Sequence, residues 1–100
     1  MVEIRWLTEA KEDLRDIYDY ISRDSKRYAK RQVDKIFNRT LILKNHIQAG
    51  RIVEEINKPE IREIIEGNYR IIYRIVTDST VDILMVHHGA RDLTLRISKK

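Results

Sequence analysis

The chain has 100 residues, of which 42% are hydrophobic and 36% are charged, and its formal net charge at pH 7 is +4. This length and composition predict one globular domain over residues 1–100, built around a single hydrophobic core. The lack of cysteine excludes a disulfide framework, a thiolate metal site and a cysteine nucleophile. The positive charge suits an anionic partner, such as nucleic acid or an acidic protein segment.

The first residues, MVEIRWL, alternate charged and apolar side chains and lack the apolar run of a signal peptide. No stretch approaches the roughly 20 apolar residues that a membrane span needs. We therefore expect a cytoplasmic protein. His46 lies far from His87 and His88 in the sequence, so zinc binding by histidines alone has no further support, and we expect no metal or cofactor.

Helical periodicity dominates the first half of the chain, after a short alternating strand at residues 2–6. Thr8 is the expected N-cap of a helix that runs to about residue 23. Asp24-Ser25 can cap a second helix, whose apolar stripe runs from Ala29 to Ile47 and for which Gly50 is a plausible stop. Because the link is very short, we expect an antiparallel helix hairpin.

The second half of the chain has the composition of strands. Residues 51–60 contain Pro59 and are expected to form a connection with a short extended piece at Ile52-Val53. Isoleucine, valine and tyrosine are frequent in three segments that follow, which predicts strands at 61–66, 69–76 and 81–88. Gly67-Asn68 is a hairpin signal and Asp78-Ser79 a weaker one. The expected fold is α+β, in the order β-α-α-β-β-β, with an antiparallel sheet packed on the helix hairpin.

Two-residue hairpins would fix the register of these three strands, and each face of the sheet can then be described. Arg70 would lie opposite both Ile65 and His87. The same face would carry the pair Ile72–Met85 and the pair Arg74–Ile83, and no segment is predicted to cover it. A slip of one residue would place His88 there instead of His87. The helix hairpin is expected on the other face, against an apolar surface of Ile64, Ile71, Tyr73, Leu84 and Val86.

The segment VHHGARD, residues 86–92, could supply a phosphate site on the uncovered face. Gly89 lets the chain bend, which could bring Arg91 near Arg70. Two guanidinium groups can hold phosphate oxygens, and a histidine between them could exchange a proton near neutral pH. The alternative is structural: Arg70 pairs with Glu63 or Glu66 in a weak surface contact, and His88 packs toward the core at the strand end.

Two other groups of residues have ordinary explanations. Three tyrosines, Tyr18, Tyr20 and Tyr28, are expected to pack between the helices. The second helix has a basic face that is expected to be solvated, as is the terminal sequence RISKK. The residues of that face are Lys26, Arg27, Lys30, Arg31 and Lys35.

In its order of segments the sequence resembles the ParE/RelE superfamily of type II toxins, and the ParE-like branch more closely. The resemblance covers nearly the whole chain. It rests on TEAKEDLRDIYDYI after the first strand, then on GRIVEE, REIIEGNYRIIYRI and finally VHHGARD. It implies a toxin neutralised by a cognate antitoxin. ParE-like members poison DNA gyrase, whereas RelE-like members are ribosome-dependent endoribonucleases that cleave mRNA without a metal.

The resemblance also implies functional residues. The family's sheet arginine corresponds to Arg70 and its arginine after the last strand to Arg91. We expect partner binding through Arg70, Arg74, His87 and Arg91, and no catalytic residue if the chain is ParE-like. If the chain is a nuclease, the catalytic set would be Arg70, His87 and Arg91, with Arg62 or His88 as further candidates.

Departures from the nuclease pattern favour the ParE-like alternative. Lysines are missing from the strand before Arg70, where the segment reads IREIIE and Arg62 is the available base. No tyrosine follows Tyr73, although several of those nucleases use a C-terminal one. We therefore expect a gyrase inhibitor that is not an enzyme. We expect its antitoxin to bind the uncovered sheet face and the helices through an acidic or amphipathic segment.

Overall fold

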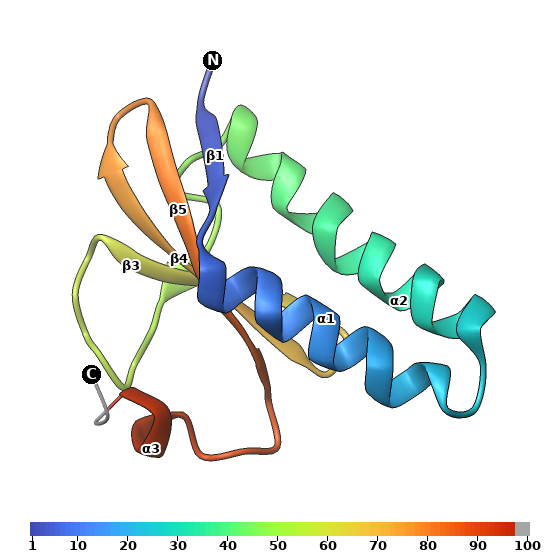
Figure 1. Ribbon diagram of the computed structural model, residues 1–100. Helices are drawn as coiled ribbons and strands as arrows, with labels where there is room; N and C mark the ends of the chain where they lie inside the picture. The colour runs from blue at the N-terminus through green and yellow to red at the C-terminus, as the bar shows by residue number, and fades with distance from the viewer. Residues whose placement is uncertain (98–100) are drawn as a thin grey trace.

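The computed structural model describes residues 1–97, so Ser98–Lys100 and with them most of the expected solvated tail lie outside the described residues. It confirms the α+β fold and the order of the main elements (Figure 1). The short β2 overlaps the extended piece expected at Ile52-Val53, whereas α3 was not predicted. The elements are β1 (Glu3–Trp6), α1 (Thr8–Ser22), α2 (Lys26–Arg39), the 3-10 helix η1 (Thr40–Lys44), β2 (Arg51–Ile52), β3 (Ile61–Glu66), β4 (Tyr69–Thr77), β5 (Thr80–His88) and α3 (Leu93–Ile97).

The five strands form one sheet in the order β1-β5-β4-β3-β2. The last four are antiparallel neighbours, as expected, and β1, for which no pairing was predicted, joins β5 in parallel, so the sheet is mixed. Parallel pairing needs a long crossover, and everything between Trp6 and Thr80 supplies it. The helix hairpin belongs to this crossover and lies across one face of the sheet (Figure 1).

The helix ends differ in part from expectation. Ser25 caps α2 as predicted, and its hydroxyl accepts a hydrogen bond of 3.1 Å from the N–H of Tyr28. The prediction for Thr8 is wrong, because Leu7 occupies the N-cap of α1 without a side-chain hydrogen bond. The N–H of Leu7 still donates to Ile83 of β5 at 3.1 Å. Leu7 therefore ends the pairing of β1 with β5 and begins α1.

Gly50 does not end a helix. The α-helix ends at Arg39 and continues as η1 to Lys44, well before Gly50. Gly50 instead lies against Tyr73: its N–H donates to the tyrosine oxygen at 3.0 Å, and a Cβ at this position would lie 2.7 Å from the ring. Close approach of the backbone to a buried aromatic ring explains the glycine.

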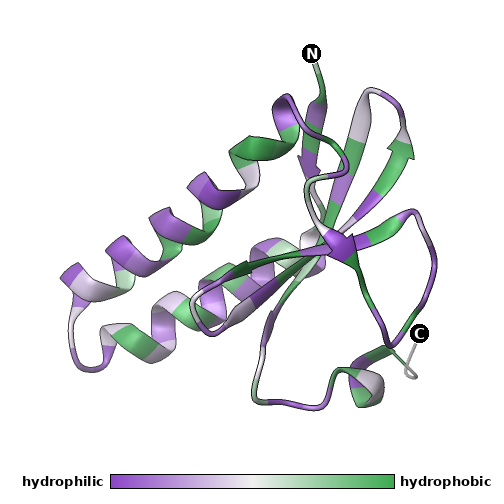
Figure 2. Ribbon diagram, turned by 180° about the vertical axis from the view of Figure 1, so that it is seen from behind, coloured by the Kyte–Doolittle hydropathy of each residue, from purple (hydrophilic) through white to green (hydrophobic). Residues whose placement is uncertain are grey.

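A large core fills the space between the sheet and the helices. Its buried members come from α1, α2, η1 and the three long strands. Figure 2 shows hydrophobic and hydrophilic residues alternating around α1 and α2, as expected for helices with one buried side. Two of the three tyrosines expected to pack between the helices do not, because Tyr20 is 70% exposed and Tyr28 54%. The buried residues of this core are Ala10, Ile36, Leu43, Ile64, Ile71, Tyr73, Val81, Ile83 and Val86.

The other face of the sheet is covered, which corrects the expectation of an open surface. Val53 from the segment after β2 and Leu93 from α3 pack on Ile72 and Met85, and all four are at most 4% exposed. Ile56, Ile61, Leu84 and Ile97 surround them. This second core buries most of the sheet face that was expected to bind an antitoxin.

The register agrees with prediction at the turn end of the sheet. Arg70 lies opposite Ile65 and His87, and Ile72 lies opposite Met85. A bulge then shifts the pairing, so Arg74 faces Asp82 and not Ile83. Leu84, which the bulge leaves unpaired, packs with the second core instead of the helix-side core. Within residues 1–97, no helix has the length and apolar character needed to cross a membrane.

Candidate functional site

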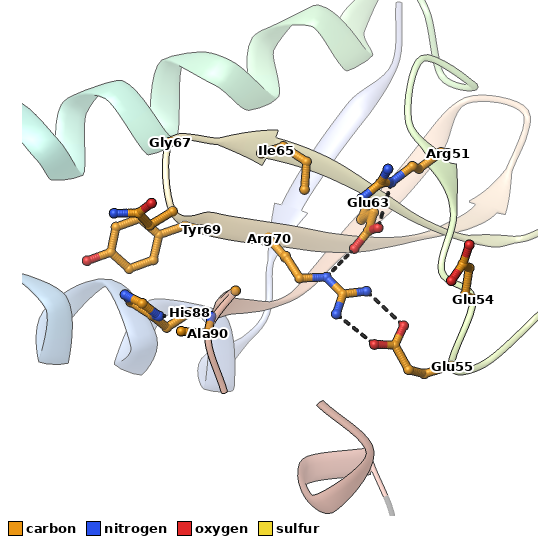
Figure 3. A pocket seen from close by; sticks show the side chains of 12 residues that line it. Arg51, Glu54, Glu55, Glu63, Ile65, Gly67, Tyr69, Arg70, His88 and Ala90 are labelled. Carbon is orange, nitrogen blue, oxygen red and sulfur yellow. Dashed lines mark hydrogen bonds and ion pairs between the residues drawn. The ribbon is translucent and has the colours of Figure 1, made fainter. Parts of the chain in front are cut away.

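Arg70 lies at the centre of a cluster of charged side chains (Figure 3). Its Nε donates to Glu63 at 2.5 Å, and Nη1 and Nη2 donate to the two carboxylate oxygens of Glu55 at 2.7 and 2.8 Å. The Arg70 side chain is only 16% exposed. Its guanidinium is thus bound on two sides by the chain's own carboxylates, including one bidentate contact.

Glu63 connects this cluster to a second arginine. Its side chain is 2% exposed, and the oxygen that does not face Arg70 accepts from Nε of Arg51 at 2.8 Å. The structural alternative for Arg70 is therefore confirmed for Glu63, although the pair is partly buried and Glu63 itself is buried. Glu66, the other candidate, lies at the end of the strand opposite Tyr69. The charge of the buried Glu63 carboxylate would be costly to desolvate alone, and the two arginines that flank it compensate this charge.

The ion pairs shift the pKa values of the groups that form them. The hydrogen bonds from Arg70 lower the pKa of Glu55 to about 2. The pKa of Arg70 is raised above its ordinary value, chiefly by the hydrogen bonds to Glu55 and secondarily by those to Glu63. At neutral pH these groups are ionised and mutually neutralised.

The cluster lies at one end of a surface cleft of about 530 Å³. In Figure 3 the carboxylates and Arg51 lie at one end, and Tyr69 and His88 lie at the other. The cleft has two arginines and three glutamates, so its charged groups do not form a cationic phosphate site. It is lined by Arg51, Glu54, Glu55, Glu63, Ile65, Gly67, Asn68, Tyr69, Arg70, His88, Gly89 and Ala90.

His87 neighbours Arg70 across the strands, as predicted, but both of its ring nitrogens are engaged elsewhere. Nδ1 lies 3.5 Å from Nη1 of Arg96, and Nε2 lies 3.0 Å from the carbonyl oxygen of Arg91. Because arginine only donates, Nδ1 is the acceptor, and the proton belongs on Nε2. The residue is 4% exposed. His87 is thus a buried structural side chain, outside the lining of the cleft.

Arg96 is a central residue of this region that sequence reasoning missed. Its Nη2 donates to Asp13 at 2.6 Å and to Glu9 at 2.9 Å, so it joins α3 to α1. The same oxygen of Asp13 accepts the N–H of Val86 at 2.8 Å. Glu9 and Asp13, one helical turn apart, were a visible signal for a cation partner, but the short helix that presents Arg96 was not predicted.

His88 occupies the strand end as the structural interpretation predicted, but it is only half-buried, and the buried histidine is His87. Its ring meets Tyr69 edge to face, with ring centres 5.4 Å apart, and its Nδ1 accepts from the N–H of Ala90 at 3.2 Å. It also lines the cleft, so it is partly accessible.

The remaining arginines are not assembled around Arg70. Arg91 is exposed in the turn after β5, and within residues 1–97 its guanidinium makes no hydrogen bond or ion pair with Arg70 or His87. Arg74 is exposed on β4. Arg62 alternates to the helix side of β3 and donates to the carbonyl oxygens of Pro59 and Gly50, each at 3.0 Å. The proposed catalytic set is therefore dispersed. Among residues 1–97 no cluster of three potential ligands could hold a metal ion.

Comparison with known proteins gives a consistent picture. A sequence model of the family described as "ParE toxin of type II toxin-antitoxin system, parDE" matches residues 4–93. The chromosomal ParDE toxin-antitoxin system from P. aeruginosa contains a similar structure, with a TM-score of 0.74 and 26% sequence identity, over 88% of this chain and 96% of that one.

A second similar structure comes from the toxin-antitoxin complex RelBE2 of Mycobacterium tuberculosis. Its TM-score is 0.56 and its identity 24%, over 87% of this chain and 96% of that one, so it supports the fold alone. No curated protein matches the chain.

Proposed function

Because the chain belongs to the ParE toxin family of type II toxin-antitoxin systems, we propose that it inhibits growth by poisoning DNA gyrase and that a cognate antitoxin neutralises it. It would act in the cytoplasm as a single toxin domain. The chain would work by binding the topoisomerase, with no chemistry of its own.

The observation that carries this proposal is the state of Arg70. A nuclease of this fold would need cations poised to stabilise the extra negative charge on phosphorus in the transition state. Here the guanidinium of Arg70 binds Glu55 and Glu63, and a phosphate would have to displace a bidentate carboxylate. His87, the candidate acid or base, is buried with both nitrogens occupied. These contacts favour a binding protein over the RelE-like endoribonuclease.

The four residues expected to bind a partner divide into two groups. Arg74 and Arg91 are exposed, and we assign them direct contacts with the target. Arg70 and His87 are buried or nearly so, and we assign them a positioning role: Arg70 holds the segment at Glu55, and His87 holds the turn at Arg91. Removal of either side chain would shift the segment that it positions, without removing a direct contact with the target.

The antitoxin would bind the cleft edge and the helices, since the second core covers the sheet face. At the cleft, Arg51 has a 72% exposed side chain and Ile65 is 41% exposed. An amphipathic segment with an acidic residue would match this pair of a cation and an aliphatic side chain. The similar P. aeruginosa structure comes from a ParDE toxin-antitoxin system, which supports a partner of this kind.

The proposal is tested with purified gyrase, supercoiling substrate and the full chain at increasing molar ratio. We expect loss of supercoiling and accumulation of cleaved DNA trapped on the enzyme. The Arg74→Gln/Arg91→Gln variant should lose most of the effect while it keeps the unfolding midpoint of the unchanged protein. Uninhibited gyrase at stoichiometric excess of folded toxin would contradict the proposal.

The nuclease alternative is tested in the same preparation. Primer extension on translating ribosomes should show no new mRNA ends when the chain is added. Cleavage within codons in the ribosomal A site, together with unaffected gyrase, would replace the gyrase proposal by the RelE-like one.

A further inference from the structure

The charge of this protein is concentrated on α2. Between Lys26 and Arg39 the helix has six basic residues and one acidic residue, for a net charge of +5. The whole chain has a net charge of +4, so everything outside α2 together is net −1. The six cations of the helix are Lys26, Arg27, Lys30, Arg31, Lys35 and Arg39.

These cations are not used by the fold. All six are exposed, whereas the opposite side of the helix buries Ala29 and Ile36. Lys30 pairs with Asp34 at 2.9 Å, a contact between side chains that are 76% and 55% exposed. Within residues 1–97, none of the other five cations of α2 forms an ion pair. Like charges one turn apart on a helix repel one another, so an anionic partner bound to this face would relieve their repulsion.

The outer face of α2 is accessible to a large ligand. The helix hairpin extends beyond the sheet, and α2 forms its outer arm (Figure 1). Residues one turn apart, such as Arg27, Arg31 and Lys35, form a row with a spacing of about 6 Å along the helix. A helix with its side chains is roughly 10–12 Å across, which is close to the width of the DNA major groove, about 12 Å.

The composition of the surface favours nucleic acid over an acidic protein. A shallow depression there is lined by Tyr18, Lys26, Arg27, Lys30, Arg31, Asp34, Lys35 and Asn38. Only one of these side chains is aromatic and none is aliphatic. The centre of a protein–protein interface is depleted in lysine, aspartate and glutamate, whereas phosphate contacts from lysine and arginine dominate binding to DNA.

We propose that the outer face of α2 binds the phosphate backbone of duplex DNA without sequence specificity. If the proposed function also holds, this face would contact the DNA segment that gyrase has bound, while Arg74 and Arg91 contact the enzyme. The DNA surface itself does not depend on gyrase and is measured without it.

The test is fluorescence anisotropy of a labelled 25-base-pair duplex titrated with the full chain at several salt concentrations. Neutralising about four phosphates gives a slope of log K against log salt of roughly −3 to −4. The Arg27→Gln/Arg31→Gln/Lys35→Gln variant should reduce that slope by about 2 to 3 and weaken binding at least about tenfold.

A matched control separates the helix face from the overall charge. The Lys11→Gln/Arg15→Gln/Lys58→Gln variant removes the same three charges from exposed positions outside α2. It should keep nearly the full salt slope. Circular dichroism and the unfolding midpoint verify that both variants are folded.

Three results would overturn the inference: equal weakening by the two variants, absence of binding by the folded chain at low salt, or tighter binding to duplex RNA or polyglutamate than to DNA. The gyrase assay is read separately. Gyrase poisoning without DNA binding would remove the inference and leave the proposed function. DNA binding without gyrase poisoning would do the reverse, and the α2 face would remain a DNA surface.

Discussion

Arg70 joins two segments of the chain through a cluster of charged side chains. Its side chain is 16% exposed, and Glu55 and Glu63 bind its guanidinium. The carboxylates come from two segments, so the cluster ties the loop after β2 to the sheet. Loss of activity in an Arg70 variant can therefore reflect loss of structure, and stability must be measured alongside it.

The first prediction concerns the ion pair between Arg70 and Glu63. Glu63 has a 2% exposed side chain, and Arg70→Ala leaves it with Arg51 as its one cationic partner within residues 1–97. We expect a decrease of about 3 kcal/mol in the free energy of unfolding, measured by urea denaturation. Arg51→Ala, at an exposed position, should cost less than about 1 kcal/mol. The double variant Arg70→Met/Glu63→Leu should recover most of the loss, and failure to recover would mean that packing, and not the uncompensated charge, causes it.

The second prediction concerns Glu55 and pH. Its pKa falls from an ordinary value of 4.5 to about 2 in the fold. A depressed carboxyl pKa stabilises the folded state above the unfolded value and loses that contribution as pH falls through the folded value. The difference in unfolding free energy between the unchanged protein and Glu55→Gln should therefore be full at pH 6 and shrink between about pH 5 and 2. Glu54→Gln, in the same cleft, is the control, because Glu54 forms no ion pair within residues 1–97. A difference that is constant with pH would contradict the assignment.

At the scale of elements, the short connections determine more than their length suggests. The segment from η1 to β3 contains no long element, yet Val53 is fully buried and Gly50 lies against Tyr73. The tyrosine oxygen accepts from Gly50 and donates to the carbonyl of Ile47 at 2.9 Å. One buried hydroxyl thus satisfies two backbone groups of an irregular segment, which holds the cleft residues at Arg51 and Glu55 in place.

The third prediction tests this contact from both sides. In Gly50→Ala the new Cβ would lie 2.6 Å from the carbonyl oxygen of Glu63 and 2.7 Å from the Tyr73 ring, so the backbone must move. We expect a loss of about 2–3 kcal/mol in unfolding free energy. Tyr73→Phe should cost about 1–3 kcal/mol, because it leaves the buried N–H of Gly50 without a partner. An unchanged midpoint of thermal unfolding in Gly50→Ala would show that the contact between Gly50 and Tyr73 is looser than these distances indicate.

At the scale of the whole molecule, one sheet supports two cores. Neighbouring residues of β4 belong to different ones: Ile71 faces the helices and Ile72 faces Val53 and Leu93, and both are fully buried. The helix-side core contains more residues and joins the longest elements, whereas the second core attaches only short segments. Local stability should therefore differ between the two faces.

The fourth prediction follows from this adjacency. Ile71→Ala and Ile72→Ala remove the same atoms one residue apart, and each should cost about 2–5 kcal/mol. Hydrogen exchange distinguishes them. Ile72→Ala should raise exchange in residues 53–57 and 89–97 while α1 and α2 stay protected, whereas Ile71→Ala should raise exchange throughout the molecule. Identical exchange profiles would mean that the two faces unfold as one unit.

The sequence by itself determined the two long helices, the strands β1, β3, β4 and β5, and the order in which they follow. Periods of 3.6 and 2 residues, the Ser25 cap and the Gly67-Asn68 turn are local signals, and each arises from neighbours along the chain. The same local rules placed Arg70 beside Ile65 and His87. The tertiary structure alone decided what covers the sheet, because Leu93, Val53 and Arg96 reach their partners through contacts between distant segments. The bulge at Leu84 also depends on the tertiary structure, because packing on both faces of the sheet determines which residue of β5 has no partner on β4. Arg70 therefore lies in a partly buried cluster of ion pairs and not in a phosphate clamp, because its carboxylate partners are brought together only when the chain folds.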